Sequence, residues 1–352
     1  MLTNPLMTRT LLRQLLLVIS LLFMPEMALA KPDLLRKELD DIVNRFHGKI
    51  GYSFHHLKTG DHLDQLGNEH FPTASTIKLA ILCAAMEREQ KGEISYDDPR
   101  TFAEQDRQYG TGLLYNYRAG TKIPLRMLLH LMITQSDNTA AIMLGQWLGT
   151  EAINGWLDGH NLKQTRLLVP FPYKGSFEEA QAIGGKPWEP LKQWGIGVTT
   201  PQEMRILMEM ILDGRAGTPT ACEEMQRILS HQFYDDGIAS QIPPWVSVAS
   251  KHGSEDQTRS DVAIVHAPSG DYVLTIYTKD AKDTGVKWDN EQDTAIRAIS
   301  RAIWRYYNPR IKWSPPPGSE KLYLFQTEPC YPGMPCWPEK SKEQKKPSPG
   351  QD

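Results

Sequence analysis

Residues 71–82 read "FPTASTIKLAIL" and place a lysine three positions after a serine, at the start of an apolar run. The polar residues before Ser75 and the apolar residues after Lys78 predict a loop that leads into a buried helix. Residues three apart lie on one face of a helix, so the two side chains should be neighbours. Burying an unpaired ammonium is strongly unfavourable, so Lys78 needs a partner. A lysine desolvated in a pocket can have a pKa low enough to act as a base toward a serine hydroxyl.

The composition is typical of a globular protein with a sizeable core. The 352 residues are 40% hydrophobic and 23% charged, and the formal net charge is -3. This balance argues against a nucleic-acid partner, which would need clustered basic residues. The ten histidines form no H-E-x-x-H pair, and the chain has neither G-x-x-x-x-G-K-[ST] nor G-x-G-x-x-G. We therefore predict no metal and no cofactor.

The first 30 residues have the layout of a secretory signal peptide. Arg9 and Arg13 precede the apolar stretch "QLLLVISLLF", and small residues stand at Ala28 and Ala30. A basic start, a short apolar segment and an A-x-A site predict cleavage after Ala30. An uncleaved membrane anchor is the alternative, although about ten apolar residues are too few to span a bilayer comfortably. We expect an exported monomer, periplasmic or secreted, without a stable membrane span.

The predicted elements follow in the order helix, two strands, a long helical stretch, three strands and a final helix. Their ranges are 35–46; 49–67, turning at Lys58-Thr59-Gly60; 75–240; 245–279, turning at Ser269-Gly270; and 293–307. Because strands and helices do not alternate, this order favours an α+β fold over a parallel α/β one. We predict one antiparallel five-stranded sheet flanked by the terminal helices, with an all-helical lobe over about 72–240, in a folded domain of residues 31–308.

The remaining residues, 309–352, form a Pro-rich tail that we expect to be extended and partly disordered. Ten of the 25 prolines fall between Pro309 and Pro349. Cys330 and Cys336 bracket the short loop "CYPGMPC", which predicts a local disulfide in an exported chain. Cys83 lies in the apolar run after Lys78 and should be a core residue. Cys222 has no obvious mate.

Two further motifs could work with the first. Ser136-Asp137-Asn138 stands between two apolar helical runs, where the serine can pass a proton to a leaving amine. Its asparagine amide can bond Lys78 and a substrate carbonyl. Taken alone, S-D-N is equally well read as a helix N-cap. The third motif is the K-H-G of residues 251–253, at the close of an apolar strand; its lysine can hold a substrate carboxylate, and its glycine lets an extended substrate approach.

The three motifs, in this order, resemble the S-x-x-K, S-D-N and K-T-G motifs of class A β-lactamases and penicillin-binding proteins. The resemblance runs from about Ile50 to Tyr307 and is especially clear over residues 110–149. It implies a serine β-lactamase-like catalytic domain with Ser75 as the nucleophile. It also implies an oxyanion hole made by the backbone N–H of Ser75 and of Ser254 or Glu255.

The resemblance implies hydrolysis of the β-lactam amide through a Ser75 acyl-enzyme. Two alternatives stay open. One is a D,D-peptidase-like penicillin-binding protein acting on peptidoglycan peptides. The other is a slowly deacylating β-lactam-binding or sensor protein.

The third motif departs from the family pattern. A literal K-T-G occurs at Lys58-Thr59-Gly60, but it precedes Ser75 and is expected to be a hairpin turn. In the catalytic strand, Lys251-His252-Gly253 replaces the family's hydroxyl residue by histidine. An imidazolium could donate to the substrate carboxylate instead, which would favour binding at lower pH. Arg259 is a candidate second cation for that carboxylate, with a plain surface position as the alternative.

The base that deacylates the enzyme is also displaced. The family's loop runs T-R-L-D-R-W-E-P-E-L-N, and this chain matches its start at residues 165–167. Direct counting then places Phe171 where the family has its first glutamate. The W-E-P-L stretch of residues 188–191 looks like the missing segment moved by an insertion, so Glu189 is the candidate base; Glu178 and Glu179 are also available. Without a positioned carboxylate, Ser75 would acylate but release product slowly.

Overall fold

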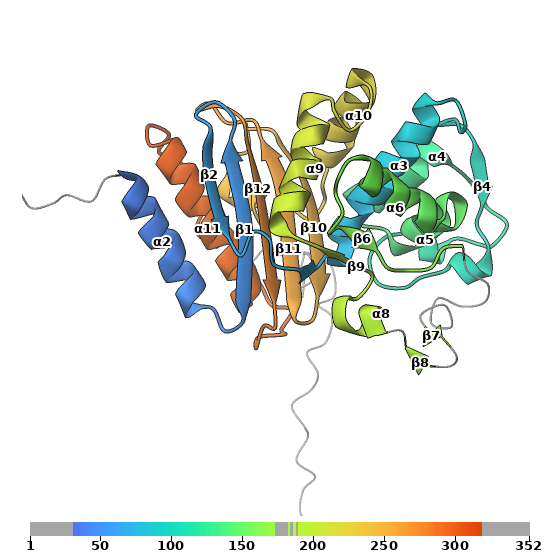
Figure 1. The fold of residues 1–352 in the computed structure, drawn as a ribbon, viewed down its shortest axis with the longest axis horizontal. Helices are drawn as coiled ribbons and strands as arrows, with labels where there is room; N and C mark the ends of the chain where they lie inside the picture. Colours follow the sequence, from blue (N-terminus) through green and yellow to red (C-terminus); the bar gives the residue numbers. More distant parts are fainter. Residues whose placement is uncertain (1–30, 173–181, 184–185, 188, 319–352) are drawn as a thin grey trace, which may run out of the picture. The chain divides into compact units, whose positions relative to one another are not determined.

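The computed structural model describes residues 31–172, 182–183, 186–187 and 189–318 (Figure 1). The described chain divides into two compact units, one ending at Asp41 and one beginning at Ile42. Helix α2 (Lys31–Arg45) begins in the first unit and confirms the predicted first helix. The predicted signal peptide and the Cys330–Cys336 loop lie outside the described residues.

The second unit is built on the predicted five-stranded antiparallel sheet. Its strands are β1 (Lys49–His56), β2 (Asp61–Gln65), β10 (Val248–Glu255), β11 (Thr258–Val265) and β12 (Tyr272–Lys279), in the order β10-β11-β12-β1-β2. The first two strands join the last three through β1 and β12, where Phe54 lies opposite Leu274. The fold class predicted from the element order is therefore confirmed. The literal K-T-G lies in the turn between β1 and β2, where Gly60 has a φ of 76°, so it is a turn as expected.

The two faces of the sheet receive different helices. Side chains alternate between the faces along each strand, and two threonines of β12 show which helix covers which face. Thr278 Oγ1 donates to Gln292 Oε1 of α11 (Glu291–Tyr307) over 2.7 Å, whereas Thr275 Oγ1 donates to the carbonyl of Pro201 over 2.8 Å. Pro201 begins α9 (Pro201–Asp213). Helix α11 therefore covers one face and α9 the other, as Figure 1 shows.

The chain between β2 and β10 forms the helical lobe. Its helices are α3 (Lys78–Gln90), α4 (Leu125–Thr134), α5 (Asn138–Leu148), α6 (Thr150–Gly159), α8 (Glu189–Trp194) and α10 (Pro219–Leu229), besides α9. Its 3-10 turns are η1 (Ala74–Ile77), η2 (Glu104–Asp106), η3 (Leu114–Asn116) and η4 (Ala239–Gln241). Its short strands are β3 (Phe71–Pro72), β4 (Pro99–Thr101), β5 (Lys122–Pro124), β6 (Arg166–Leu167), β7 (Ala182–Ile183), β8 (Lys186–Pro187) and β9 (Gly197–Thr199).

These short strands refine the all-helical lobe that the sequence predicted. Strands β3, β9 and β6 form a three-stranded sheet, and β4 pairs with β5. Pro124 ends β5 and is the N-cap of α4. Its backbone is extended, with a ψ of 152°, because it still pairs with Pro99 of β4.

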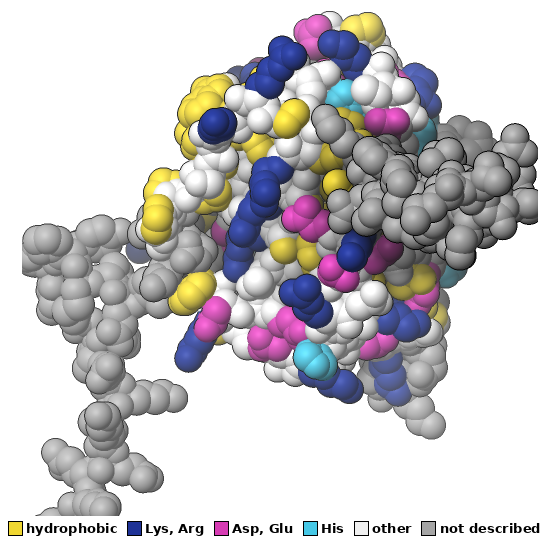
Figure 2. Space-filling view, turned by 90° about the vertical axis from the view of Figure 1, so that its left-hand side faces the viewer, with side chains coloured by type: hydrophobic (Ala, Val, Ile, Leu, Met, Phe, Trp, Pro, Cys, Tyr) yellow, Lys and Arg dark blue, Asp and Glu magenta, His cyan; other side chains and the backbone are white. Residues whose placement is uncertain are grey.

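Helix α3 is the buried helix predicted after Ser75. Its residues 78–86 are all buried, including Lys78 at 2% exposure. Cys83 is a core residue as predicted, with its Sγ 3.8 Å from Met225 Sδ. Cys222 is also buried, and both thiols are free. None of the helices in the described part is long and apolar enough to cross a bilayer. On the face shown in Figure 2, acidic and basic side chains are interspersed.

The packing of α11 on the sheet should be a major source of stability. Ile299 is completely buried on this helix, whereas Arg305 is exposed. We expect Ile299→Ala to lower the free energy of unfolding by about 2–5 kcal/mol, because it leaves a cavity in the core. Arg305→Ala is the matched control and should change it by less than about 0.5 kcal/mol. Urea titrations of both variants measure the difference, and equal midpoints would contradict this account of the packing.

Candidate active site

The buried Lys78 amine is bonded to the S-D-N segment. Lys78 Nζ lies 2.6 Å from the carbonyl oxygen of Ser136, 3.1 Å from Ser136 Oγ and 2.8 Å from Asn138 Oδ1. These contacts supply the partners that the sequence demanded for a buried lysine. They also bring the S-x-x-K and S-D-N motifs together, although 58 residues separate Lys78 from Ser136.

The S-D-N segment is held by its aspartate. Asp137 is the N-cap of α5, and its Oδ1 accepts a hydrogen bond from Ala140 N over 2.9 Å. Its Oδ2 accepts from Leu113 N over 2.6 Å and from Leu114 N over 2.9 Å. The segment is thus a helix cap and a wall of the site at once. Ser136 has a positive φ of 51°, a costly backbone conformation for a residue with a side chain, which is typical of functional sites.

Ser75 lies in the η1 turn just before α3. The preceding Ala74 has a positive φ of 44°, so the nucleophile candidate also follows a strained residue. Among the described residues, Ser75 Oγ has no hydrogen bond, because Lys78 is turned to Ser136 and Asn138. Strand β10 passes directly beside the Ser75 backbone. A Cβ added to Gly253 would lie 3.0 Å from Ser75 N and 2.9 Å from the carbonyl oxygen of Thr73, so only glycine fits here.

Lys251 completes the polar cluster from the sheet side. Its Nζ donates to Ser136 Oγ over 3.2 Å and to the carbonyl of its neighbour His252 over 2.5 Å. Ser136 Oγ therefore lies between the amines of Lys78 and Lys251. The structure thus brings Lys78, Ser136, Asn138, Lys251 and Gly253 together around the Ser75 backbone.

Burial changes the charge of both lysines. It lowers the pKa of Lys78 well below the ordinary value; nearby Lys251 lowers it further, and Asp137 opposes the shift. Burial also lowers the pKa of Lys251 to about 7, with Asp261 opposing. The low dielectric between two amines that share one hydroxyl disfavours two positive charges. The lowered pKa favours the neutral form of the Lys78 amine, which can accept a proton.

His252 does not form the imidazolium that the sequence suggested. Burial lowers the pKa of His252 to about 3, and the charges of Lys251 and Arg259 add to the shift. The ring lies beside Tyr234 at a centroid distance of 6.0 Å. Alternation along β10 directs it away from the Lys251 face, opposite Asp261 of β11. The hypothesis of tighter binding at low pH is therefore wrong, because the ring stays neutral.

Arg259 is buried, not on the surface, but its bonds are structural. Its guanidinium donates to the carbonyl oxygens of Glu255, Thr258 and Gly285. Its Nε lies 3.8 Å from Asp293 Oδ1 of α11. These partners hold Arg259 toward the α11 face of the sheet, away from the face that carries Lys251.

The expected deacylation base is not placed by the structure. Glu189 is the first residue of α8, but its side chain lies outside the described residues, as do Glu178 and Glu179. Phe171, where counting puts the family's glutamate, is buried. A Cβ on Gly145 of α5 would lie 2.5 Å from its ring. A core aromatic therefore occupies that position. In the described part of the chain, no group of three or more acidic, His or Cys side chains could hold a metal ion.

One contributor to the site carried no role in the sequence prediction. Thr111 Oγ1 donates to the carbonyl of Ser136 over 2.7 Å, and Asn138 Nδ2 donates to the carbonyl of Tyr109 over 3.2 Å. The sequence feature that could have predicted this role is the pair of glycines around Thr111, because Gly110 and Gly112 have positive φ values of 111° and 110°. They let this loop pass close to the S-D-N segment.

Comparisons with known proteins agree with this arrangement. A family model described as the Beta-lactamase enzyme family matches residues 34–307. The chain is 21% identical over 319 residues to the β-lactamase VEB-1 of Pseudomonas aeruginosa, covering 84% of this chain and 97% of that protein. It is 23% identical over 304 residues to CARB-4 of the same organism, covering 84% and 98%.

Solved structures show the same fold. A β-lactamase of Xanthomonas campestris pv. campestris is 23% identical with a TM-score of 0.67, covering 78% of this chain and 98% of that one. The protein PBP-A is 23% identical with a TM-score of 0.66, covering 78% and 96%.

The contribution of the Asp137 cap to the free energy of unfolding can be measured. Asp137→Ala removes three acceptor contacts to backbone N–H groups. We expect it to lower the free energy of unfolding by about 3 kcal/mol or more, because buried donors are left unsatisfied. Thr218→Ala is the matched control, since it removes one N-cap bond from α10 and should cost about 1 kcal/mol. Denaturant titration that finds the two losses equal would contradict the bridging role.

The neutral state of His252 predicts a simple pH dependence. We expect wild type and His252→Thr to share the same shape of acylation efficiency between about pH 5 and 8, because the ring does not titrate there. An acid-side gain that disappears in the variant would contradict this.

The low pKa of His252 also makes the stability of the folded protein depend on pH. Only the unfolded chain protonates this ring below its ordinary pKa of about 6.5. We therefore expect the stability due to His252 to fall as the pH drops from about 6.5 toward 3, by up to about 1.4 kcal/mol per pH unit. Denaturant titrations over this range should show the loss in wild type but a smaller one in His252→Thr.

Proposed function

The chain belongs to the beta-lactamase enzyme family, and from this premise we propose that Ser75 opens the β-lactam amide through an acyl-enzyme. The family assignment confirms the predicted resemblance and a serine hydrolase of the β-lactamase type. The roles of individual residues are our proposal. One observation carries it: Ser136 Oγ lies 3.1 Å from Lys78 Nζ and 3.2 Å from Lys251 Nζ.

The proposed acylation uses Lys78 as the general base. The neutral amine takes the proton of Ser75 Oγ, and the oxygen attacks the lactam carbonyl carbon. The C–N bond then breaks, and the leaving nitrogen takes a proton from Ser136. Ser136 is reprotonated by Lys78, to which it is already hydrogen-bonded. The transfer from Lys78 to Ser136 follows a hydrogen bond that is already present, whereas the first transfer requires Lys78 to turn toward Ser75 Oγ.

The backbone beside Ser75 would stabilise the developing oxyanion. The close approach of Gly253 to Ser75 N places the outer edge of β10 next to the nucleophile. The donors we propose are Ser75 N and the backbone N–H of Ser254 or Glu255. Preorganised donors of this kind are usually the largest contribution to such catalysis. The Asn138 amide would bind the carbonyl of the substrate, and Lys251 would bind its carboxylate.

A second candidate function has its own observation. The buried Phe171 removes the carboxylate from the position where counting along the family loop would place it, which favours slow deacylation. PBP-A shares the fold, and one of its variants was solved as an acyl-enzyme complex with penicillin G. A D,D-peptidase-like protein acting on peptidoglycan peptides, or a β-lactam sensor, would keep the same acylation chemistry.

We also propose the cellular setting from the sequence. The A-x-A layout supports export to the periplasm or the medium after cleavage of residues 1–30. The folded domain of residues 31–308 would act as a monomer, followed by the Pro-rich tail of 309–352.

The nucleophile is tested by intact-mass measurement after brief incubation with penicillin G. We expect Ser75→Ala to form no adduct and to hydrolyse no chromogenic cephalosporin. Ser230→Ala is the matched control, because Ser230 is an exposed serine at the end of α10. Lys78→Ala should acylate about 10²–10⁴-fold more slowly, since it lacks the general base. Unchanged labelling of Ser75→Ala would end the proposal.

Turnover separates the two candidate functions. Rapid loss of the adduct with excess product supports a β-lactamase, whereas an adduct that persists supports the peptidase or sensor.

A further inference from the structure

Strand β10, which passes beside the Ser75 backbone at Gly253, ends in a carboxylate residue, Glu255. We propose that Glu255 activates the water that hydrolyses the Ser75 acyl-enzyme, in place of a glutamate from the loop after α6. This inference rests on the proposed acylation of Ser75. It concerns only the second half of the reaction, the release of the acyl group.

Strand geometry puts Glu255 on the catalytic face. Side chains two residues apart in a strand point to the same side of the sheet. Lys251 uses this face to reach Ser136 Oγ, and Gly253 packs against Ser75 N on it. Glu255 is the next residue of this series and the last residue of β10. Its side chain therefore leaves the sheet on the side of Ser75.

The other wall of the site confirms the direction of the carboxylate. Thr73, two residues before Ser75, donates from its N to the carbonyl of Gly197 over 2.9 Å. Two residues before Gly197, a Cβ added to Gly195 would lie 2.9 Å from Glu255 Oε1 and 3.0 Å from Oε2. The turn carrying Ser75 is thus flanked by β9 and β10, and the Glu255 carboxylate bridges toward the segment between α8 and β9.

The separation suits a water-mediated contact. Two residues of a strand span about 6.6 Å, which sets the scale of the offset from Gly253 to Glu255. One water with two hydrogen bonds of about 2.8 Å spans about 5.6 Å. The two lengths are similar, so this backbone offset is compatible with a water between the carboxylate and the ester. A general base that acts through the attacking water needs this arrangement.

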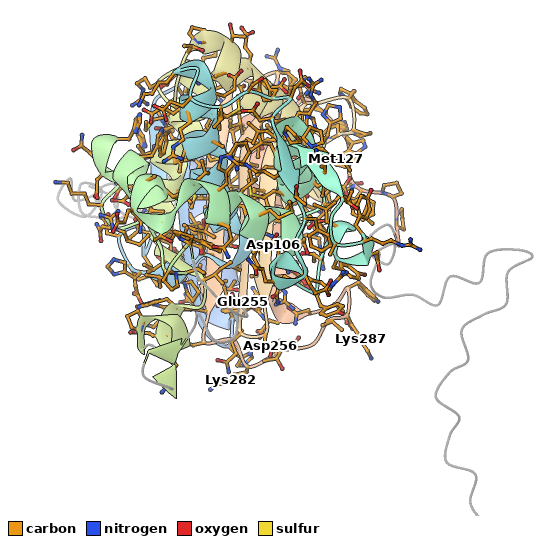
Figure 3. All side chains as sticks on the ribbon, turned by 90° about the vertical axis from the view of Figure 1, so that its right-hand side faces the viewer. Asp106, Met127, Glu255, Asp256, Lys282 and Lys287 are labelled. Carbon is orange, nitrogen blue, oxygen red and sulfur yellow. The ribbon has the colours of Figure 1, made fainter. Side chains whose placement is uncertain are left out.

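Water has access to the carboxylate. Glu255 lines a cavity of about 790 Å³ together with Pro72, Trp194, Gly195 and Thr258. Figure 3 shows Glu255 lower than Asp106 of the lobe, with Asp256 beyond it at the β10–β11 turn. The side chain is exposed to this cavity and makes no hydrogen bond or ion pair with another described side chain. Its lone pairs are therefore available to a water.

The surroundings also make Glu255 a better base. Protein atoms around the cavity displace water even though the side chain is exposed, and this desolvation raises the pKa of Glu255. Asp256 adds to the rise in pKa, and Arg259 opposes it. A carboxylate with a raised pKa takes a proton from water more readily.

The proposed step is the hydrolysis of the ester between the acyl group and Ser75. Glu255 takes one proton from the water, and the water oxygen forms a bond to the acyl carbon. The bond from that carbon to Ser75 Oγ breaks, and the serine oxygen receives the proton held by Glu255, through a water or through Lys78. The products are the free acid and the original Ser75 hydroxyl.

Single-turnover kinetics of Glu255→Gln test the proposal on the full chain. Penicillin G is the probe, and intact mass follows the adduct while absorbance follows its hydrolysis. We expect acylation within about threefold of wild type and deacylation slowed about 10²–10⁴-fold, the usual contribution of a general base. Normal acylation also shows that the variant is folded. The deacylation rate of wild type should rise with pH through the raised pKa of Glu255, and that of the variant should be flat.

Three further variants sharpen the test. Asp256→Asn is the matched control, an adjacent carboxylate whose removal should alter deacylation far less than Glu255→Gln, because Asp256 acts only through the pKa of Glu255. Glu255→Asp keeps the charge on a shorter arm and should recover part of the rate lost in Glu255→Gln. A persistent adduct in Glu189→Gln, with normal release by Glu255→Gln, would overturn the proposal and place the base in the loop.

Acylation of Ser75 and the role of Glu255 in deacylation can be overturned separately. If wild type forms no adduct at all, the proposed function fails and this inference falls with it. If wild type forms the adduct and Glu255→Gln releases it at the wild-type rate, only this inference is overturned.

Discussion

The amine of Lys78 is buried in the lobe, and the rest of the site is arranged around the bonds that make this burial tolerable. Three oxygen atoms from Ser136 and Asn138 surround it within 3.1 Å. An amine without such partners would cost several kcal/mol to bury. The requirement joins α3 to the segment between α4 and α5. It also explains why Asp137 must fix that segment through α5 and the 113–114 backbone.

The sheet supplies the second constraint. Gly253 allows β10 to approach the backbone of Ser75, and Lys251 reaches across to the same hydroxyl that Lys78 contacts. Burial lowers the pKa of both amines, and the charge of Lys251 lowers that of Lys78 further. The same close packing that excludes water thus favours the neutral form of Lys78, the base that we propose for acylation. A carboxylate substrate would return negative charge to Lys251 and favour its protonated form.

Behind β10, the protein buries a different set of polar groups. His252 and Arg259 point toward the side of α11, together with Asp261, and burial raises the pKa of Asp261 to about 8. Asp261 Oδ2 accepts a hydrogen bond from Ile238 N over 2.6 Å. This set fixes the edge strand from its far side. It explains why His252 and Arg259, which the sequence offered as substrate-binding residues, are separated from Ser75 by the sheet.

The amino-acid sequence by itself determined much of this protein. The order of elements was enough for the antiparallel sheet, because hydrophobic periodicity and turn residues are local properties. The spacing of Ser75 and Lys78, and the demand of a buried amine for partners, pointed to Ser136 and Asn138 before any contact was known. The helical lobe was also predicted, though its short strands were not, since two-residue pairings leave no periodic signal.

Only the tertiary structure decided which face of β10 each residue uses and what charge it carries. His252 looked like a cation by its residue type, but its burial beside Lys251 and Arg259 makes it neutral. Arg259 looked available and is held by three backbone carbonyls. Phe171, where counting places the family's glutamate, is a buried core residue. Charge and orientation depend on neighbours distant in sequence, and no local pattern records them.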